Sequence, residues 1–264
     1  KRLKCCVCIL DCSSGFVLTD DNYKLSEVTM IFLCFSSKDR KKIAESIFYH
    51  IHNIGLPIWY DRNEILMGDD RDYKNFVEGV DCCEYAIVVL SPNAINSICA
   101  NEEIELIYSK FSKKEMYVFP VFYNIQAKDI PEQYAWTKKL VYKELNDLTD
   151  SRGLCNHVIC KVLNDIIKKL KYKKINDFFR ALSDPLKTLV SNYISTDYGN
   201  YNARAALLYA GMLFIESCEK PLPDYCKKGM EFLFNETKLS LPLDWRETLI
   251  FERLFIIMTN YYLS

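Results

Sequence analysis

The chain has 264 residues, enough for one large domain or for a medium-sized domain followed by a small one. Half of its residues are hydrophobic and 26% are charged, which is ordinary for a globular protein. Its formal net charge of −1 provides no overall attraction to nucleic acid or to an anionic membrane. The longest apolar stretch, residues 205–215, is about half as long as a membrane span. We therefore expect a soluble protein that binds neither nucleic acid nor membrane.

The twelve cysteines do not follow the pattern of a disulfide framework. Several stand inside apolar runs, where a free thiol packs as a small hydrophobic side chain. The cluster of Cys5, Cys6, Cys8 and Cys12 lacks the second half and the histidines that zinc sites use, so we expect a buried strand there and no metal. Free thiols indicate a reducing compartment, most simply the cytoplasm.

From residue 28 to about residue 174, short apolar runs alternate with amphipathic segments. Four compact apolar runs predict buried strands: 28–35, 56–60, 85–90 and 117–123. Helical spacing predicts four helices: 37–54, 73–80, one that starts near Asn101, and 154–170. Ser36 or Ser37 is expected to cap the first helix, Gly55 to end it, and residues 61–70 to form a polar loop. Buried strands that alternate with helices predict a parallel sheet covered on both faces.

Beyond about residue 176 the strand pattern stops. Four helices are expected there: 178–195, 203–218, 225–234 and 245–262. We therefore divide the chain into an N-terminal extension (1–27), an α/β domain (28–174) and a helical C-terminal module (175–264). We expect the module to form a small core of its own. It serves either as a packing or oligomerisation unit or as the binding site of a trigger or partner protein.

The residues alone single out one group of candidate catalytic side chains. Glu102, Glu103 and Glu105 lie at the predicted start of the helix that follows the third strand. Ligands of parallel sheets bind beyond the carboxyl ends of the strands, where this helix begins. The helix dipole alone also favours carboxylates in a first turn, so a purely structural role stays open. No glycine-rich phosphate loop is present.

Four motifs, taken in order, resemble those of the Toll/interleukin-1 receptor (TIR) domain family. IFLCFSSKD (31–39) is similar to the first strand of that family, and GLPIWYDRNEILMG (55–68) to its second strand and BB loop. SPNAINSICANEEIELIYS (91–109) resembles its catalytic segment, and VFPVFYNIQAKDIPEQ (118–133) its fourth strand with the loop after it. The resemblance implies a flavodoxin-like parallel sheet with helices on both faces, followed here by the small all-α module.

In the NAD-cleaving branch of that family, a segment of the form SPN-x-x-x-S-x-W-x-x-x-E carries the one catalytic glutamate. Aligned with this chain, the pattern assigns Glu103 as the catalytic residue, or Glu102 if the helix is shifted by one position. Cys99 stands where the family has tryptophan, and a thiol offers much less stacking area. The resemblance further implies an NAD⁺ site formed by five residues: Phe35, Ser36, Trp59, Asp61 and Cys99. For Trp59, a place in the core is equally compatible with the sequence.

The resemblance thus implies an NAD⁺ hydrolase or cyclase of the kind found in prokaryotic antiphage systems. NAD⁺ is then its substrate, and neither a cofactor nor a metal is expected. Self-association through the BB loop, Arg62–Asp70, is expected to complete the site. Two alternatives stay open. One is a non-catalytic TIR scaffold that only assembles with other TIR domains, which Cys99 favours; the other is a base–sugar enzyme such as a nucleoside deoxyribosyltransferase.

Overall fold

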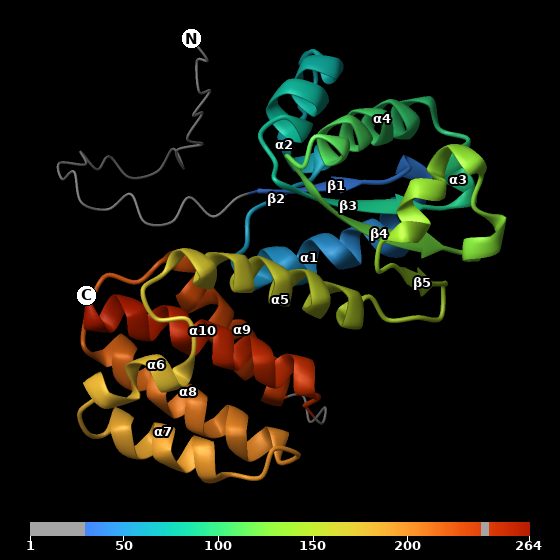
Figure 1. The fold of residues 1–264 in the computed structure, drawn as a ribbon. Coiled ribbons are helices and arrows are strands. Elements are labelled where there is room, and N and C mark those ends of the chain that lie inside the picture. The colour runs from blue at the N-terminus through green and yellow to red at the C-terminus, as the bar shows by residue number, and fades with distance from the viewer. Residues whose placement is uncertain (1–29, 239–242) are drawn as a thin grey trace.

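The computed structural model describes residues 30–238 and 243–264, and the predicted extension 1–27 with its cysteine cluster lies outside the described residues. A parallel sheet of five strands, in the order β2-β1-β3-β4-β5, forms the first part of the chain (Figure 1). The strands are β1 (Ile31–Cys34), β2 (Ile58–Trp59), β3 (Tyr85–Leu90), β4 (Tyr117–Tyr123) and β5 (Lys143–Leu145). The predicted fold class and the four predicted strands are therefore confirmed.

The short strand β5 is not predicted by the sequence pattern. It pairs with the end of β4, where Val121 lies opposite Lys143 and Tyr123 opposite Leu145. Of its three residues only Leu145 is buried. The segment therefore lacks the continuous apolar run that identifies the other strands.

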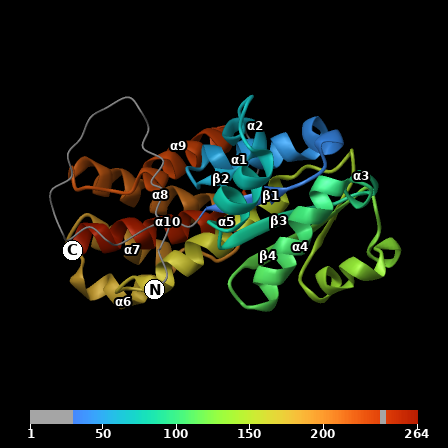
Figure 2. The same ribbon diagram turned by 90° about the horizontal axis from the view of Figure 1, so that it is seen from above.

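Helices cover both faces of the sheet (Figures 1 and 2). One face carries α1 and α5, and the other carries η3, α4 and η5. The helical segments of this part are η1 (Ser37–Asp39), η2 (Arg40–Ala44), α1 (Glu45–Asn53), α2 (Asp61–Glu64), η3 (Tyr73–Val80), α3 (Pro92–Ile95), α4 (Ile98–Ser112), η4 (Ala127–Asp129), η5 (Glu132–Lys139) and α5 (Arg152–Lys169).

The predicted limits of the first helical segment are confirmed. The side chain of Ser36 accepts a hydrogen bond from the backbone N–H of Lys38, as expected of an N-cap. Gly55 follows the C-cap of α1 with a φ of +86°, in the left-handed region that glycine adopts without strain.

The helix expected near Asn101 begins earlier, at Ile98, and the short helix α3 precedes it. Two serines explain the difference, because Ser91 caps α3 and Ser97 caps α4, each accepting a hydrogen bond from a backbone N–H three residues on. Glu103 consequently lies in the second turn of α4. There the side chain can face the sheet, whereas a first-turn position would have left it among the exposed N-terminal groups.

The helix at 73–80 is confirmed, but of the four apolar residues that predict its inward face only Val80 is fully buried. Tyr73 and Val77 are exposed, whereas Asn75 and Gly79 are buried. This segment is a π-helix, and its last backbone hydrogen bond spans five residues. Because the turns are wider, inward positions do not follow the usual 3.6-residue spacing.

The C-terminal module is helical throughout its described residues, as predicted. Its helices are α6 (Ile175–Phe178), η6 (Phe179–Ala181), α7 (Leu186–Ser195), α8 (Tyr201–Ser217), α9 (Asp224–Lys238) and α10 (Trp245–Leu263). The first expected helix, 178–195, is divided in two. Pro185 lies immediately before α7, and proline both lacks an N–H group and disfavours a helical conformation in the residue before it.

The module shares its core with the α/β domain, contrary to expectation. Helix α10 packs on α5 and α8, and α9 packs on α1 and α10 (Figure 1). One apolar cluster runs from Ile31 in the sheet through Val158 of α5 to Phe255 of α10 and Leu208 of α8. The outer faces of α1 and α5 are therefore covered by the module. The domain boundary at residues 174 and 175 stays a prediction.

Replacing Gly55 by alanine tests this shared packing. A Cβ atom there would lie 2.7 Å from the Cα of Tyr225 in α9, and the positive φ is itself unfavourable for alanine. We expect Gly55→Ala to lower the free energy of unfolding by at least about 1 kcal/mol in urea denaturation followed by circular dichroism. Gly153→Ala is the matched control, because nothing lies within 4 Å of its Cβ position. Equal effects of the two substitutions would contradict the packing described.

Candidate active site

Glu103 lies beside the carboxyl end of β1 and is only 8% exposed. Its Oε1 atom accepts a hydrogen bond from Nδ2 of Asn75 at 3.0 Å. The thiol of Cys34, the last residue of β1, also interacts with the carboxyl group. A carboxyl group enclosed in this way is unusual, because glutamate is seldom buried without a positively charged partner in direct contact.

Burial raises the pKa of Glu103 to about 8. The hydrogen bond from Cys34 opposes this rise, the negative charge of Asp61 adds to it, and the positive charge of Arg71 opposes it. A low-dielectric environment disfavours the charged form of a carboxyl group, which explains the direction of the main effect. At neutral pH, Glu103 is therefore mainly protonated and uncharged in this arrangement.

Asn75 is a site residue that the sequence reasoning missed. It is buried, and its Oδ1 atom has no hydrogen-bond partner among the described residues. Gly79, one turn further along η3, explains how it reaches Glu103: a Cβ at Gly79 would lie 2.8 Å from the Phe32 ring and 3.0 Å from the Trp59 ring. Without a side chain there, η3 lies directly on the sheet. Only the π-helical spacing would have identified Asn75 as facing inward.

Arg71, also absent from the sequence-based prediction, lies on the solvent side of the site. Its Nη1 atom donates to the Sγ of Cys99 at 2.8 Å, and its Nη2 atom lies 3.9 Å from the carboxylate of Glu102. Glu102 has a side chain that is 45% exposed, in contrast to the buried Glu103. The structure thus separates the two candidate glutamates: Glu103 faces the sheet, and Glu102 faces solvent beside Arg71.

Arg40 joins two of the predicted binding residues, Phe35 and Asp61, at the ends of β1 and β2. It forms two hydrogen bonds with the carboxylate of Asp61, at 2.8 and 2.7 Å. Its guanidinium lies 5.2 Å from the centre of the Phe35 ring and 5.5 Å from that of Tyr60. Ser36 is buried next to Phe35, where it caps the helix. Phe35, Ser36 and Asp61 therefore form one group, and Asp61 is close enough to influence Glu103.

Trp59 lies in the hydrophobic core, on the sheet face covered by η3 and α4. Its indole Nε1 has no hydrogen-bond partner among residues 30–238 and 243–264. Of the two interpretations that the sequence left open, the structure supports the core position. A contact between Trp59 and NAD⁺ stays a prediction.

A buried hydrogen-bond network joins the SPN motif to η1, the turn that follows β1. Asp39, which is fully buried, accepts hydrogen bonds from the hydroxyl group of Ser91 and from Nδ2 of Asn93. The same hydroxyl group of Ser91 also accepts a hydrogen bond as the N-cap of α3. The start of the SPN motif is thereby held at the carboxyl ends of β1 and β3.

The BB loop, Arg62–Asp70, begins with the last residues of α2, a short helix that the sequence pattern does not predict. Asp69 closes the loop by accepting a hydrogen bond from the backbone N–H of Leu66 at 2.8 Å. Gly68 adopts a φ of +101°. The apolar tip is open to solvent, because Leu66 is 69% exposed and Met67 is fully exposed.

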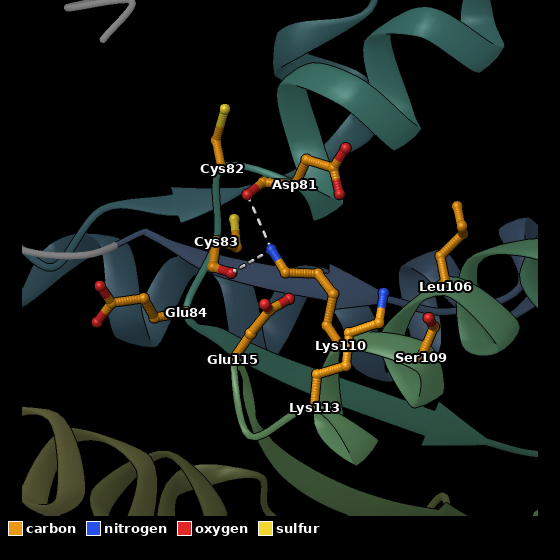
Figure 3. Close-up of a pocket in the computed structure, with 9 residues that line it drawn as sticks. All are labelled: Asp81, Cys82, Cys83, Glu84, Leu106, Ser109, Lys110, Lys113 and Glu115. Carbon is orange, nitrogen blue, oxygen red and sulfur yellow. Dashed lines mark hydrogen bonds between the residues drawn. The ribbon is translucent and has the colours of Figure 1, made fainter. Parts of the chain in front are cut away.

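A separate pocket lies at the amino end of β3, between the loop of residues 81–84 and the C-terminal half of α4 (Figure 3). The ammonium group of Lys110 donates there to the carbonyl oxygens of Val80, Asp81 and Cys83 at 2.8, 2.8 and 3.1 Å. It therefore fastens the loop to α4. None of the candidate site residues lines this pocket, which is at the opposite edge of the sheet from Glu103.

Two features are absent from residues 30–238 and 243–264. No group of three or more His, Cys, Asp or Glu side chains in this part of the chain is placed to hold a metal ion. None of its helices is sufficiently long and apolar to cross a membrane.

The parallel sheet with a buried carboxyl group at its carboxyl edge defines a flavodoxin-like α/β domain. The TIR domain family model matches residues 31–157, so this part of the chain is a TIR domain. A solved structure, the TIR domain of the Toll-related receptor TRR-2 from Hydra magnipapillata, is similar with a TM-score of 0.39 and 15% identity; the match covers 52% of this chain and 96% of that one.

Three curated relatives are named after reactions of NAD⁺ or ADP-ribose. The NAD(+) hydrolase TcpA of Theionarchaea archaeon is 23% identical over 100 residues, which are 38% of this chain and 30% of the relative. The 2′ cyclic ADP-D-ribose synthase BtTIR of Bacteroides thetaiotaomicron is 23% identical over 159 residues, 60% of this chain and 50% of the relative. AbTIR of Acinetobacter baumannii, with the same activity in its name, is 22% identical over 38% of this chain and 37% of the relative. The chain spans half or less of the length of these relatives.

Glu103→Gln should change how stability depends on pH. In the unfolded chain the carboxyl group ionises near its ordinary pKa of 4.5, and in the folded chain near 8. Between these values the unfolded state releases the proton first, so the stability contributed by Glu103 is full below about pH 4.5 and is lost as pH rises towards about 8. Glutamine cannot ionise. In urea denaturation, the free energy of unfolding of the variant relative to that of wild type should therefore rise by at least about 1 kcal/mol between about pH 5 and pH 8.

Glu102→Gln is the control for this experiment, because its side chain is exposed one position away. It should show a much smaller change over the same range. The prediction would be contradicted if Glu103→Gln and wild type differed in stability by the same amount at about pH 5 and at about pH 8. The carboxyl group would then not be buried as described.

Proposed function

We propose that this chain cleaves the bond between nicotinamide and ribose in NAD⁺, with Glu103 as its catalytic carboxylate. The observation that carries the proposal is the buried carboxyl group of Glu103, which accepts a hydrogen bond from Asn75 at the carboxyl edge of a TIR-domain sheet. Relatives named as NAD(+) hydrolase and as 2′ cyclic ADP-D-ribose synthases support the choice of substrate. Glu103 stands at the position that the sequence motif assigns to the catalytic glutamate.

The chemistry requires only one carboxylate. Breaking the nicotinamide–ribose bond leaves a ribose that resembles an oxocarbenium ion, as in glycoside cleavage. The leaving nicotinamide is already cationic in NAD⁺, so it departs as a neutral molecule without a general acid. A carboxylate beside the ribose stabilises the positive charge that develops there. Attack by water then gives ADP-ribose, and attack by an internal nucleophile gives a cyclic isomer.

For this role Glu103 has to lose its proton. A cation beside a carboxyl group favours the charged form and lowers its pKa, and bound NAD⁺ would bring its positively charged nicotinamide ring to the site. Arg71 already acts on Glu103 in the same direction. The substrate thereby generates the ionised form that its own cleavage needs.

Access to Glu103 also has to change, since a side chain that is 8% exposed does not face a dinucleotide. The described arrangement is thus the resting form. Self-association through the BB loop supplies the change, since Leu66 and Met67 expose an apolar tip close to Arg71 in the sequence. An assembly-activated enzyme of this type suits an effector of prokaryotic antiphage immunity, whose trigger or partner protein binds the helical module.

A second function, that of a non-catalytic scaffold, is favoured by one observation. Cys99 replaces the family's tryptophan and holds the guanidinium of Arg71 at 2.8 Å. A site closed in this way serves assembly without turnover. The two functions differ in whether the assembled protein consumes NAD⁺.

Glu103→Gln should lower the rate of NAD⁺ cleavage by about two orders of magnitude or more, because it removes the charge that stabilises the transition state. Nicotinamide release by concentrated full-length protein measures the rate, and chromatography of the products separates ADP-ribose from cyclic isomers. Glu102→Gln is the matched control and should retain most of the activity. Loss of activity in Glu102→Gln alone would place the catalytic residue one position earlier. Cleavage of nucleosides in place of NAD⁺ would indicate a base–sugar enzyme of another type.

Leu66→Glu should abolish both self-association and NAD⁺ cleavage while leaving the monomer folded. A charge at an exposed apolar tip prevents its burial against a second copy but costs the isolated domain little. Leu148→Glu is the control, because Leu148 is 97% exposed in the segment that follows β5, outside the BB loop. Light scattering and circular dichroism report assembly and folding. Full turnover by a strictly monomeric protein would refute the requirement for assembly.

A further inference from the structure

The boundary between α5 and α10 contains a group of polar atoms that the proposed function does not use. In the described residues, three buried side-chain atoms there have no hydrogen-bond partner: Nε2 of His157, Nε of Arg246 and Nη1 of Arg253. His157 is on α5, and the two arginines are on α10, two helical turns apart. We call these three residues the seam cluster.

Several observations bring the members of the seam cluster close to Cys160 at the contact between α5 and α10. The two helices pack against each other, and the Sγ of Cys160 lies 3.7 Å from the carbonyl oxygen of Arg246. Cys160 is one turn from His157 on α5. Burial raises the pKa of the Cys160 thiol, and the charges of Arg253 and Arg246 oppose that rise, so both guanidinium groups lie near the thiol. Burial lowers the pKa of His157, and Arg246 lowers it further.

The nearby acidic groups do not neutralise this cluster. Asp244 lies 3.8 Å from Nη1 of Arg246, which leaves Nε of the same guanidinium without a partner. Glu247 is buried and is already paired with Arg152. Lys143, on β5, adds a further positive charge that acts on His157. Among the described residues, two arginines and a lysine thus act with one carboxylate, Asp244, for which only the ion pair with Arg246 is seen.

Buried hydrogen-bond donors without partners are costly, and more so when they belong to charged groups. The cost disappears if an anion accepts from them. Arginine guanidinium groups bind phosphate oxygens with paired hydrogen bonds, and neutral histidine donates through one ring nitrogen. The side chain of Arg246 is 26% exposed, so an ion can reach the cluster from solvent.

We infer that the seam cluster is a binding site for a phosphate-type anion, held jointly by α5 and α10. A free phosphate or the phosphates of a nucleotide supply this chemistry. Trp245 provides the means to tell them apart, because its ring is exposed and the guanidinium of Arg246 lies 4.5 Å from its centre. An exposed indole at this point offers a stacking surface to a base. The inference is independent of NAD⁺ cleavage at Glu103.

Occupation of the site has a structural consequence. Helix α5 covers one face of the sheet and α10 is the last helix of the C-terminal module, so an anion bound by both would fasten the module to the α/β domain. A ligand that binds only the folded state also stabilises that state in proportion to its concentration and affinity.

Isothermal titration calorimetry of the full chain tests the inference, with inorganic pyrophosphate and ADP as probes at constant ionic strength. We expect saturable binding of at least one probe, with a Kd of about 1 mM or tighter. Arg246→Gln and Arg253→Gln should each weaken it by about tenfold or more, because each removes a charged donor. Arg180→Gln, at an exposed arginine in η6, is the matched control and should leave it unchanged. Trp245→Leu should weaken only the binding of ADP if a nucleotide is the ligand, and of neither probe if it is free phosphate.

Two results would overturn the inference. One is the absence of saturable binding of both probes to folded wild-type protein, a result that does not depend on any variant. The other is unchanged affinity in Arg246→Gln and Arg253→Gln once circular dichroism has shown that they are folded. Each substitution removes a buried hydrogen-bond donor that has no partner among the described residues, so the variants should lose little stability without an anion. The same substitutions do not touch Glu103, so NAD⁺ cleavage is measured separately.

Discussion

The carboxyl group of Glu103, buried at the carboxyl edge of the sheet, is the constraint around which the site is built. Two serine caps place α3 and α4 so that Glu103 occupies a second turn and faces β1. Gly79 lets η3 approach the sheet closely enough for Asn75 to donate to the same carboxyl group. Together, the serine caps and the close approach of η3 bury the carboxyl group of Glu103, and burial favours its uncharged form.

The same constraint explains why catalysis would depend on a change of state. A protonated, enclosed carboxyl group cannot stabilise a ribosyl cation, so under the proposed function the arrangement described is a resting form. Arg71 lies on the solvent side, where it holds Cys99 and also acts on Glu103. The helical module covers the opposite face of the sheet through α1 and α5 and shares their core. Regulation from the module would therefore reach the site through the sheet and not through direct contact with Glu103.

The sequence predicts those parts of the fold that have a strong periodic signal. Continuous apolar runs identify β1 to β4, and the SPN motif singles out Glu103, which the structure shows to be buried at the carboxyl edge of the sheet. The sequence pattern fails where an element departs from the usual spacing of buried residues. Strand β5 has one buried residue and is therefore not predicted. Segment η3 is π-helical, so the pattern does not predict that Asn75 faces inward. Arg71 is missed because an exposed charged residue carries no signal until its partners are placed. Trp59 is the opposite case, a residue that the motif singles out but that is buried in the core. Its position in the motif does not reveal that a neighbouring helix covers it.

The most direct test of the central claim is to measure the ionisation of Glu103 itself. The protein, labelled with ¹³C at glutamate side chains, is titrated by NMR, and Glu103→Gln identifies the signal by its disappearance. A carboxyl resonance that titrates with a pKa of about 8 in the unassembled protein is the predicted result. Titration near the ordinary value of 4.5 would contradict it, because the carboxyl group would then be ionised at neutral pH and no resting, uncharged form would exist.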